Sequence, residues 1–256
     1  MANKVGMFIW HDLMTTDIET SKHFYTKLFD WKLKTHPEYT ELATAQGREQ
    51  GGMMPQDPSR GIPSHWMGYV LVENVDKTTA QANELGGKTL MPPMDIPNVG
   101  RFAVIQDPQG AAFAVFLYAG GHPQKAEEEG PPTHGRFCWD ELATNDPEKA
   151  VKFYGALFGW TVQGMDMGGG MTYWMAQKDG AQVAGIMKMP KDAPHPPMWL
   201  SYVAADVDAK AKLAQELGAR AYVPPTDIPN VGRFAVVTDA QGGAFAVIKS
   251  VPPASS

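Results

Sequence analysis

The spacing of hydrophobic residues at the start of the chain predicts a strand, a helix and three more strands. Residues 7–14 have the composition of a strand, and Asp17 then stands where a helix N-cap belongs. Apolar residues follow at spacings of three and four, which is typical of an amphipathic helix. They include Phe24, Tyr25, Leu28 and Phe29. Short strands are predicted over residues 32–35, 40–45 and 50–54, with glycines between them.

The same order of elements then begins again. Residues 66–72 predict a strand, and residues 75–85 predict a helix that ends at Gly86 and Gly87. Further strands are predicted over residues 88–91, 101–105 and 111–117. The last two are joined by Asp107-Pro-Gln-Gly110, which has the proline and glycine of a tight turn. The pattern β-α-β-β-β therefore occurs twice within the first 120 residues.

The whole pattern is duplicated along the chain. The segment Phe8-Ile-Trp-His-Asp-Leu13 matches Phe137-Cys-Trp-Asp-Glu-Leu142, and residues 95–104 recur unchanged as residues 227–236. A repeat of about 130 residues is too long for a solenoid unit, so each copy is expected to be a domain. We predict an α+β protein with domains at residues 1–119 and 134–250. The Gly-, Pro- and Glu-rich residues 120–133 form the linker.

Composition narrows the classes of partner. The 256 residues are 43% hydrophobic and carry a net charge of −6, without the basic surface that nucleic acids require. No apolar run is long enough for a membrane span, and residues 1–10 do not have the pattern expected of a secretory signal. The single cysteine, Cys138, is predicted to be a buried structural thiol and excludes an internal disulfide. We expect a cytoplasmic protein without a nucleic-acid or membrane partner.

The order of these motifs resembles the vicinal oxygen chelate superfamily, which includes glyoxalase I, bleomycin-resistance proteins and extradiol dioxygenases. The resemblance rests on the Phe-Tyr and Leu-Phe pairs of the first helix, on Trp31, and on the Gly-Arg-Phe-Ala-Val and Asp-Pro-Gln-Gly segments. It covers nearly the whole chain in both halves and looks closest to tandem glyoxalase-like proteins. It implies that two β-α-β-β-β modules pair in each domain to form a sheet cupped around a cavity. It further implies that the two domains pack as a pseudo-dimer.

The resemblance also implies where a divalent metal ion would bind. Family members place histidines on the first strand of each module and a glutamate on the last strand. Imidazole and carboxylate suit such a metal, whereas indole and methyl groups cannot replace them. We therefore expect no metal and no other cofactor, although a site built from His11, His65, His134 and His195 stays open. The usual ligand positions hold Trp10, Trp66 and Ala114 in the first domain, and Trp139, Trp199 and Ala246 in the second.

The cavity that this arrangement implies has aromatic walls and a few charges. Because side chains alternate along a strand, Asp12 shares the face of Trp10, and Glu141 shares that of Trp139. Two facing indoles would form a slot for a flat or cationic ligand. Each residue also has a structural interpretation, as core packing, as an ion pair or as an anchor of the loop 95–100. The expected ligand-binding residues are Trp10, Trp66, Arg101, Trp139, Trp199 and Arg233.

Three functional hypotheses follow. The leading one is a metal-independent protein that binds a small planar organic molecule. The second is an enzyme, either a glyoxalase-like lyase or isomerase or a hydroxylase, acting on a small carbonyl or aromatic substrate. Asp12 or Glu141 would be its general base, and Arg101 or Arg233 would stabilise an oxyanion. The third is a non-catalytic interaction module whose cavities are filled, and the sequence leaves the choice between binding and catalysis open.

Overall fold

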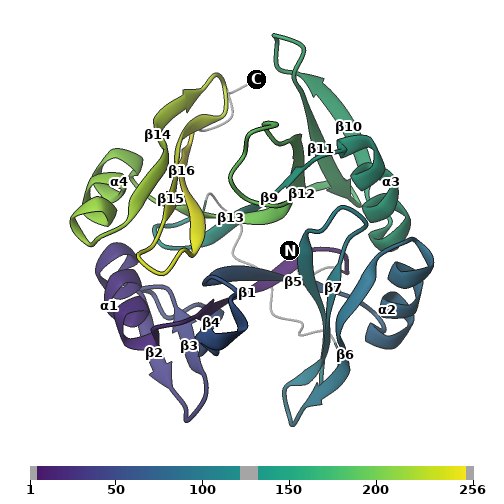
Figure 1. Ribbon diagram of the computed structural model, residues 1–256, viewed down its shortest axis with the longest axis horizontal. Coiled ribbons are helices and arrows are strands. Elements are labelled where there is room, and N and C mark those ends of the chain that lie inside the picture. The colour runs from purple at the N-terminus through teal and green to yellow at the C-terminus, as the bar shows by residue number, and fades with distance from the viewer. Residues whose placement is uncertain (1–4, 122–131, 252–256) are drawn as a thin grey trace. The chain divides into compact units, whose positions relative to one another are not determined.

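The computed structural model describes residues 5–121 and 132–251, and in these ranges both repeats fold with the same order of elements (Figure 1). The first repeat contains β1 (Phe8–Thr15), α1 (Ile18–Phe29), β2 (Lys32–Thr35), β3 (Thr40–Ala43), β4 (Glu49–Pro55), η1 (Pro58–Arg60), β5 (His65–Leu71), α2 (Val75–Glu84), β6 (Lys88–Ile96), β7 (Gly100–Gln106) and β8 (Ala112–Tyr118). The second contains β9 (Phe137–Thr144), α3 (Pro147–Phe158), β10 (Thr161–Asp166), β11 (Thr172–Lys178), β12 (Ala181–Lys188), β13 (Met198–Ala204), α4 (Val207–Glu216), β14 (Arg220–Ile228), β15 (Gly232–Thr238) and β16 (Ala244–Ser250).

The strands form two eight-stranded sheets, one from each repeat. The strand order is β2-β3-β4-β1-β5-β8-β7-β6 in the first sheet and β10-β11-β12-β9-β13-β16-β15-β14 in the second. In each module the strand before the helix pairs in parallel with the last strand of that module, as β1 does with β4 and β5 with β8. The predicted α+β fold, with two β-α-β-β-β modules in each repeat, is confirmed.

Helix α1 begins after the predicted cap Asp17, and α2 matches the predicted range 75–85 to within one residue. Asp17 caps α1 by accepting a hydrogen bond from the Thr20 amide at 3.0 Å, and Asp146 caps α3 in the same way. Gly159 ends α3 in the left-handed conformation at φ 67°, which a glycine adopts without steric cost. Within the described residues, none of the helices combines the length and apolarity that crossing a bilayer requires.

The edge strands β6 and β14 are longer than predicted. Both continue through a Pro-Pro pair, to Ile96 and to Ile228, and their pairing with the next strand shifts register twice. Proline cannot donate to a neighbouring strand, but an edge strand has a side on which no donor is needed. The prediction that the strand ends at Met91 is wrong for this reason.

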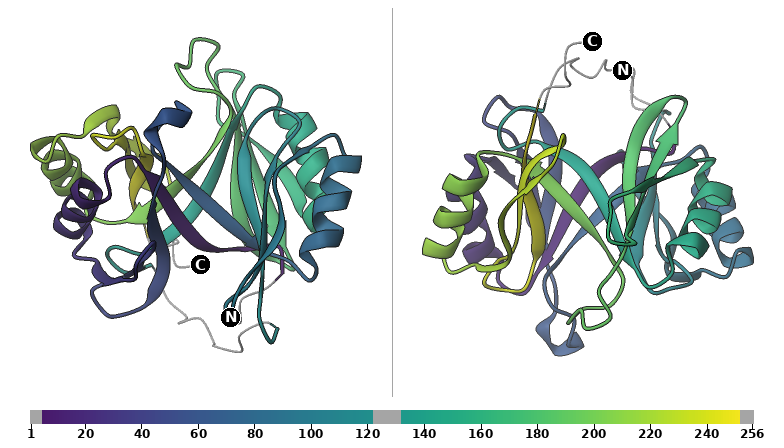
Figure 2. Two further views of the ribbon diagram at one scale, coloured as in Figure 1. Left: turned by 60° about the horizontal axis from the view of Figure 1, so that its bottom comes forward. Right: turned by 90° about the horizontal axis from the view of Figure 1, so that it is seen from above.

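The compact units of the structure do not coincide with the sequence repeats. Within the described ranges, unit 1 contains residues 5–10, 67–121 and 139–199, and unit 2 contains residues 11–66, 132–138 and 200–251. Each unit thus takes one module from each repeat. Helices α2 and α3 lie side by side in unit 1, and α1 and α4 do so in unit 2 (Figure 2). The domain boundaries predicted from the sequence, at residues 119 and 134, stay a prediction, and most of the linker lies outside the described residues.

Unit 1 is joined at its centre by a buried chain of hydrogen bonds between the repeats. Tyr154 of α3 donates from its hydroxyl to Oδ2 of Asp107 at 3.0 Å and accepts a bond from Nε1 of Trp199, also at 3.0 Å. Oδ1 of Asp107 accepts three backbone N–H groups of its own turn, at 2.8 to 3.0 Å. Gln109 adds two hydrogen bonds to the backbone of Asp146. The turn of the first repeat is therefore bonded to a helix of the second.

Unit 2 contains the equivalent chain with the repeats exchanged. Tyr25 of α1 donates to Oδ2 of Asp239 at 2.8 Å and accepts from Nε1 of Trp66 at 3.0 Å. Burial raises the pKa of both tyrosines, and the adjacent aspartate raises it further. The hydroxyls therefore stay protonated and act as permanent donors.

Candidate ligand site

In the second repeat, one face of the half-sheet β9–β12 packs on α3 and the other carries Trp139 and Glu141. Leu142, Ala176 and Ile186 are fully buried and belong to the core beneath α3. Trp139 and Glu141 alternate with Leu142 along β9, so their side chains lie on the opposite face, and both are partly exposed. We call the side of a half-sheet opposite its helix the open face.

Three side chains on this open face form a directed chain of hydrogen bonds. Nε1 of Trp139 donates to the hydroxyl of Tyr173 at 3.1 Å, and this hydroxyl donates to Oε2 of Glu141 at 2.8 Å. Burial raises the pKa of Tyr173, and the charge of Glu141 raises it further. The phenol therefore remains a donor and holds the carboxylate in one orientation.

Gly185 makes room for the tyrosine. It lies in the middle of β12, in register with Glu141 on one side and Met175 on the other. A Cβ atom added at Gly185 would overlap the hydroxyl of Tyr173. Glycine is required here because the phenol lies directly on the backbone.

Methionines share the open face with Trp139, Tyr173 and Glu141. Residues paired in register share a face, so Gln163, Met175, Gly185 and Glu141 form one row across the four strands. Met165, Tyr173 and Met187 form the next row. Methionine is flexible and polarisable, and it packs well on aromatic rings. The open face of the second repeat thus combines a fixed carboxylate with soft apolar side chains.

The first repeat has the same pair of groups in unit 2. The hydroxyl of Tyr39 donates to Oδ1 of Asp12 at 2.7 Å, and Gly52 lies beneath the tyrosine as Gly185 does beneath Tyr173. Asp12 is 4% exposed, whereas Glu141 is half-buried. Tyr39 and Tyr173 were not among the residues singled out from the sequence.

Trp66 and Trp199 lie elsewhere than expected. Both are buried in the core, at 7% and 4% exposure, where their indole N–H groups donate to Tyr25 and Tyr154. The expectation that they line a cavity is corrected because these hydroxyls, on α1 and α3, lie on the helix side of the sheet. Trp10, the counterpart of Trp139, is half-buried in unit 1.

Arg101 and Arg233 each bond to two carboxylates that anchor a hairpin. Arg101 makes two hydrogen bonds of 2.8 Å to Asp76 of α2 and one of 2.9 Å to Asp95 of β6. Arg233 binds Asp208 and Asp227 in the same way, at 2.9 to 3.0 Å. The structure thus agrees with the interpretation of these arginines as anchors of the loop.

The positions that the superfamily uses for a metal do not fit one in this chain. Ala114 and Ala246 are fully buried methyl groups, paired in register with Tyr69 and Tyr202. The indoles of Trp66 and Trp199 present N–H donors, which cannot coordinate a cation. Across the described residues, no three His, Cys, Asp or Glu side chains gather as a metal site would require.

The candidate histidines lie in separate surroundings. His11 stacks on Phe137 with the ring centres 4.1 Å apart, and His134 lies 3.3 Å from Asp30. His65 and His195 contact the carbonyls of nearby prolines. Cys138 is half-buried, less than expected, and its thiol donates to the carbonyl of Tyr202 at 3.5 Å.

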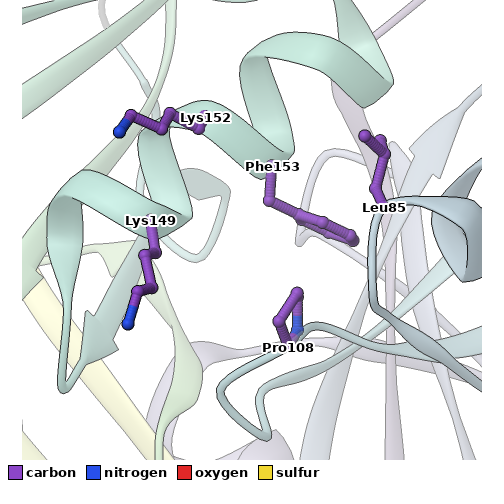
Figure 3. Close-up of a pocket in the computed structure, with 5 residues that line it drawn as sticks. All are labelled: Leu85, Pro108, Lys149, Lys152 and Phe153. Atoms are coloured by element: carbon purple, nitrogen blue, oxygen red, sulfur yellow. The ribbon is translucent and has the colours of Figure 1, made fainter.

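A shallow hollow of about 230 Å³ in unit 1 lies on the helix side, away from the open face. The ring of Phe153 lies near Leu85 and Pro108. The ammonium groups of Lys149 and Lys152 point away from this ring (Figure 3). Lys149 is paired with Asp146 at 3.1 Å. This hollow holds no group of the Trp139–Tyr173–Glu141 chain.

Comparisons with known proteins agree with the duplicated modules described above. Residues 7–115 and 136–247 each match the Glyoxalase/Bleomycin resistance protein/Dioxygenase superfamily, and the chain belongs to this family. A Mycobacterium bovis protein named "Putative glyoxylase CFP32" is 36% identical, over 95% of this chain and 94% of its own. The anthracycline biosynthesis protein DauV of Streptomyces sp. is 32% identical, over 95% and 93%.

The fold of this chain is similar to that of a solved glyoxalase structure. The Mn(II)-bound glyoxalase from Novosphingobium aromaticivorans superposes with a TM-score of 0.63 over 98% of this chain and 85% of its own, at 15% identity. That protein is described with a metal, whereas the usual ligand positions of this chain hold tryptophan and alanine. At this identity the likeness shows the fold alone.

Proposed function

We propose that the protein binds a small planar organic molecule on the open face of the second repeat, without a metal ion. The observation that carries this proposal is the chain from Trp139 through Tyr173 to Glu141, which fixes a carboxylate at a partly exposed position. A fixed acceptor beside an indole suits a flat ligand with a hydrogen-bond donor at its edge.

The hydrogen-bond geometry supports a hydroxyl as that donor. Tyr173 gives its only proton to Oε2 of Glu141. An ionised carboxylate has about four acceptor positions, so the bond from Tyr173 does not by itself saturate Glu141. The methionines Met165, Met175 and Met187 supply a surface that adapts to an aromatic ring.

The relatives favour the same ligand class. DauV is named for anthracycline biosynthesis, and anthracyclines are planar, polycyclic and hydroxylated. A ligand of this type matches a face with an indole and a carboxylate. We further propose that the protein is cytoplasmic and that residues 1–119 and 134–250 are its two homologous sequence domains, which fold together rather than separately.

Thermal unfolding with small aromatic probes tests the proposal. Naphthalen-2-ol should raise the midpoint of unfolding, because a ligand at about a hundred times its Kd adds about 2.7 kcal/mol of stability. Trp139→Ala should abolish the rise, while Trp10→Ala, the matched change in the first repeat, should retain it. The absence of any rise across hydroxylated aromatic probes would count against the proposal.

Catalysis at the same group is a second candidate, because an oriented carboxylate can act as a general base. Glu141 would move a proton from the hydroxyl-bearing carbon to the neighbouring carbonyl carbon, and the hydroxyl proton would pass to the former carbonyl oxygen. This isomerises the substrate without another reactant. Tyr173 would act as a positioning residue. Isomerisation of a 2-oxoaldehyde–thiol adduct that is lost in Glu141→Gln would support this candidate, and the absence of turnover would remove it.

A further inference from the structure

The two open faces differ in chemistry at equivalent positions. In the second repeat, the row that ends at Glu141 contains Gln163 and Met175. In the first repeat, the row that ends at Asp12 contains Lys34 and Glu41 at the same places. An uncharged amide and a thioether in the second repeat are therefore replaced by an ammonium group and a carboxylate in the first.

The next row shows the same exchange. Met165 pairs with Tyr173 in the second repeat, while the amide of His36 bonds to the carbonyl of Tyr39 in the first. Met165 is 46% exposed. His36 thus holds the position of Met165, and an imidazole replaces a thioether beside each tyrosine.

The charged side chains of the first repeat bind one another. Glu41 accepts hydrogen bonds from Lys34 at 3.0 Å and lies 2.9 Å from Nε2 of His36. Partial burial raises the pKa of Glu41, but these two partners outweigh it, so the pKa lies below its usual value. An apolar ring placed here would have to displace this ionic cluster and remove its charges from water.

The different burial of the two carboxylates also makes the second repeat the more accessible one. Asp12 is 4% exposed and shorter by one methylene than Glu141, which is half-buried. A ligand on the open face would reach the carboxylate of the second repeat more readily than that of the first.

From these differences we infer that the chain binds one planar ligand, in the second repeat only, and that positions 163, 165 and 175 determine this choice. The inference rests on the proposed function, because it names which of the two similar faces performs it. Lys34, His36 and Glu41 make the first face unsuitable while the Tyr–carboxylate pair remains.

Exchange of the three positions between the repeats tests the inference. Isothermal titration of the full chain with naphthalen-2-ol should give about one ligand per chain. The variant Q163K/M165H/M175E should weaken binding by roughly tenfold or more, the size expected when charged groups line an apolar surface. The reverse variant K34Q/H36M/E41M should raise the stoichiometry to about two. Circular dichroism and thermal unfolding of both variants control for misfolding, and both should show the cooperative unfolding of the unmodified chain.

The outcomes separate the inference from the function on which it rests. About two ligands per unmodified chain would overturn the inference and leave the function standing. Binding of one ligand that is weakened by K34Q/H36M/E41M, and not by Q163K/M165H/M175E, would place the ligand on the first repeat. That result would also overturn the inference and leave the function standing. Failure of the unmodified chain to bind any hydroxylated aromatic probe would instead overturn the function itself.

Discussion

The hydroxyl of Tyr154 lies 3.0 Å from Oδ2 of Asp107 and bonds a helix of the second repeat to a turn of the first. Removing it in Tyr154→Phe should leave the buried Trp199 N–H and the carboxylate without this partner. An unsatisfied buried group costs about 1–3 kcal/mol, which urea unfolding would measure. Tyr25→Phe should cost a similar amount in unit 2. A change below about 0.5 kcal/mol in both variants would contradict this role.

The stability difference between Asp107→Asn and the unmodified protein should depend on pH. Burial raises the pKa of Asp107 against the lowering effect of its hydrogen bonds. A raised pKa means that the folded state binds more protons than the unfolded state, so stability falls as pH rises from about 4, the ordinary value. Asparagine removes this dependence. The destabilisation in Asp107→Asn should therefore be largest at low pH and shrink toward pH 7, and equal destabilisation at all pH values would contradict the raised pKa.

Separate expression of the two repeats should show that neither is complete. Each compact unit takes one module from each repeat, so a chain of residues 1–121 alone exposes the surfaces that pack on the second repeat. Residues 122–256 should restore the cooperative thermal transition when they are added. Intact folding of residues 1–121 as a monomer, measured by sedimentation and circular dichroism, would contradict the interleaved arrangement.

The hydroxyl of the ligand should be recognised by Glu141. Glu141→Gln should weaken binding of naphthalen-2-ol by about tenfold or more, since a hydrogen bond to a charged group contributes about 1.5–3 kcal/mol. It should leave binding of 2-methoxynaphthalene, which has no hydroxyl, nearly unchanged. Titration calorimetry of both probes gives the comparison. Equal loss for the two probes would indicate that the substitution disturbs the face rather than one hydrogen bond.

Gly185→Ala should displace Tyr173, because the added methyl group overlaps the phenol hydroxyl. Overpacking of this kind costs about 1–3 kcal/mol. Probe affinity should fall together with thermal stability. Gly52→Ala creates the matching overlap with Tyr39 and should lower stability without changing affinity. Loss of binding in both variants would show that the two faces do not act separately.

The repeated modules could be predicted from the sequence because their signals are local. Helix spacing, the caps Asp17 and Asp146 and the Asp-Pro-Gln-Gly turn depend on neighbouring residues. The orientation of Trp66 could not be predicted, because residues 66–71 are buried on both faces and show no alternation. The sequence of a strand buried on both faces does not show which side chains face the helix.

The tyrosines of the candidate site were missed because their partners are distant in sequence. Tyr173 contacts Glu141 across two strand pairings, β11 with β12 and β12 with β9. Nothing in the sequence near either residue predicts this contact. One signal was available, since Gly52 and Gly185 interrupt strands at equivalent places in both repeats. A glycine inside a strand indicates close approach of another group, which here is a phenol.

The indole of Trp160 donates a hydrogen bond to the carbonyl of Gly6 at 2.7 Å. This bond connects the start of the first repeat to the residues that follow α3 in the second. Proteolytic trimming of the first ten residues would therefore loosen the packing around Trp160, more than a hundred positions away, before it loosened α1.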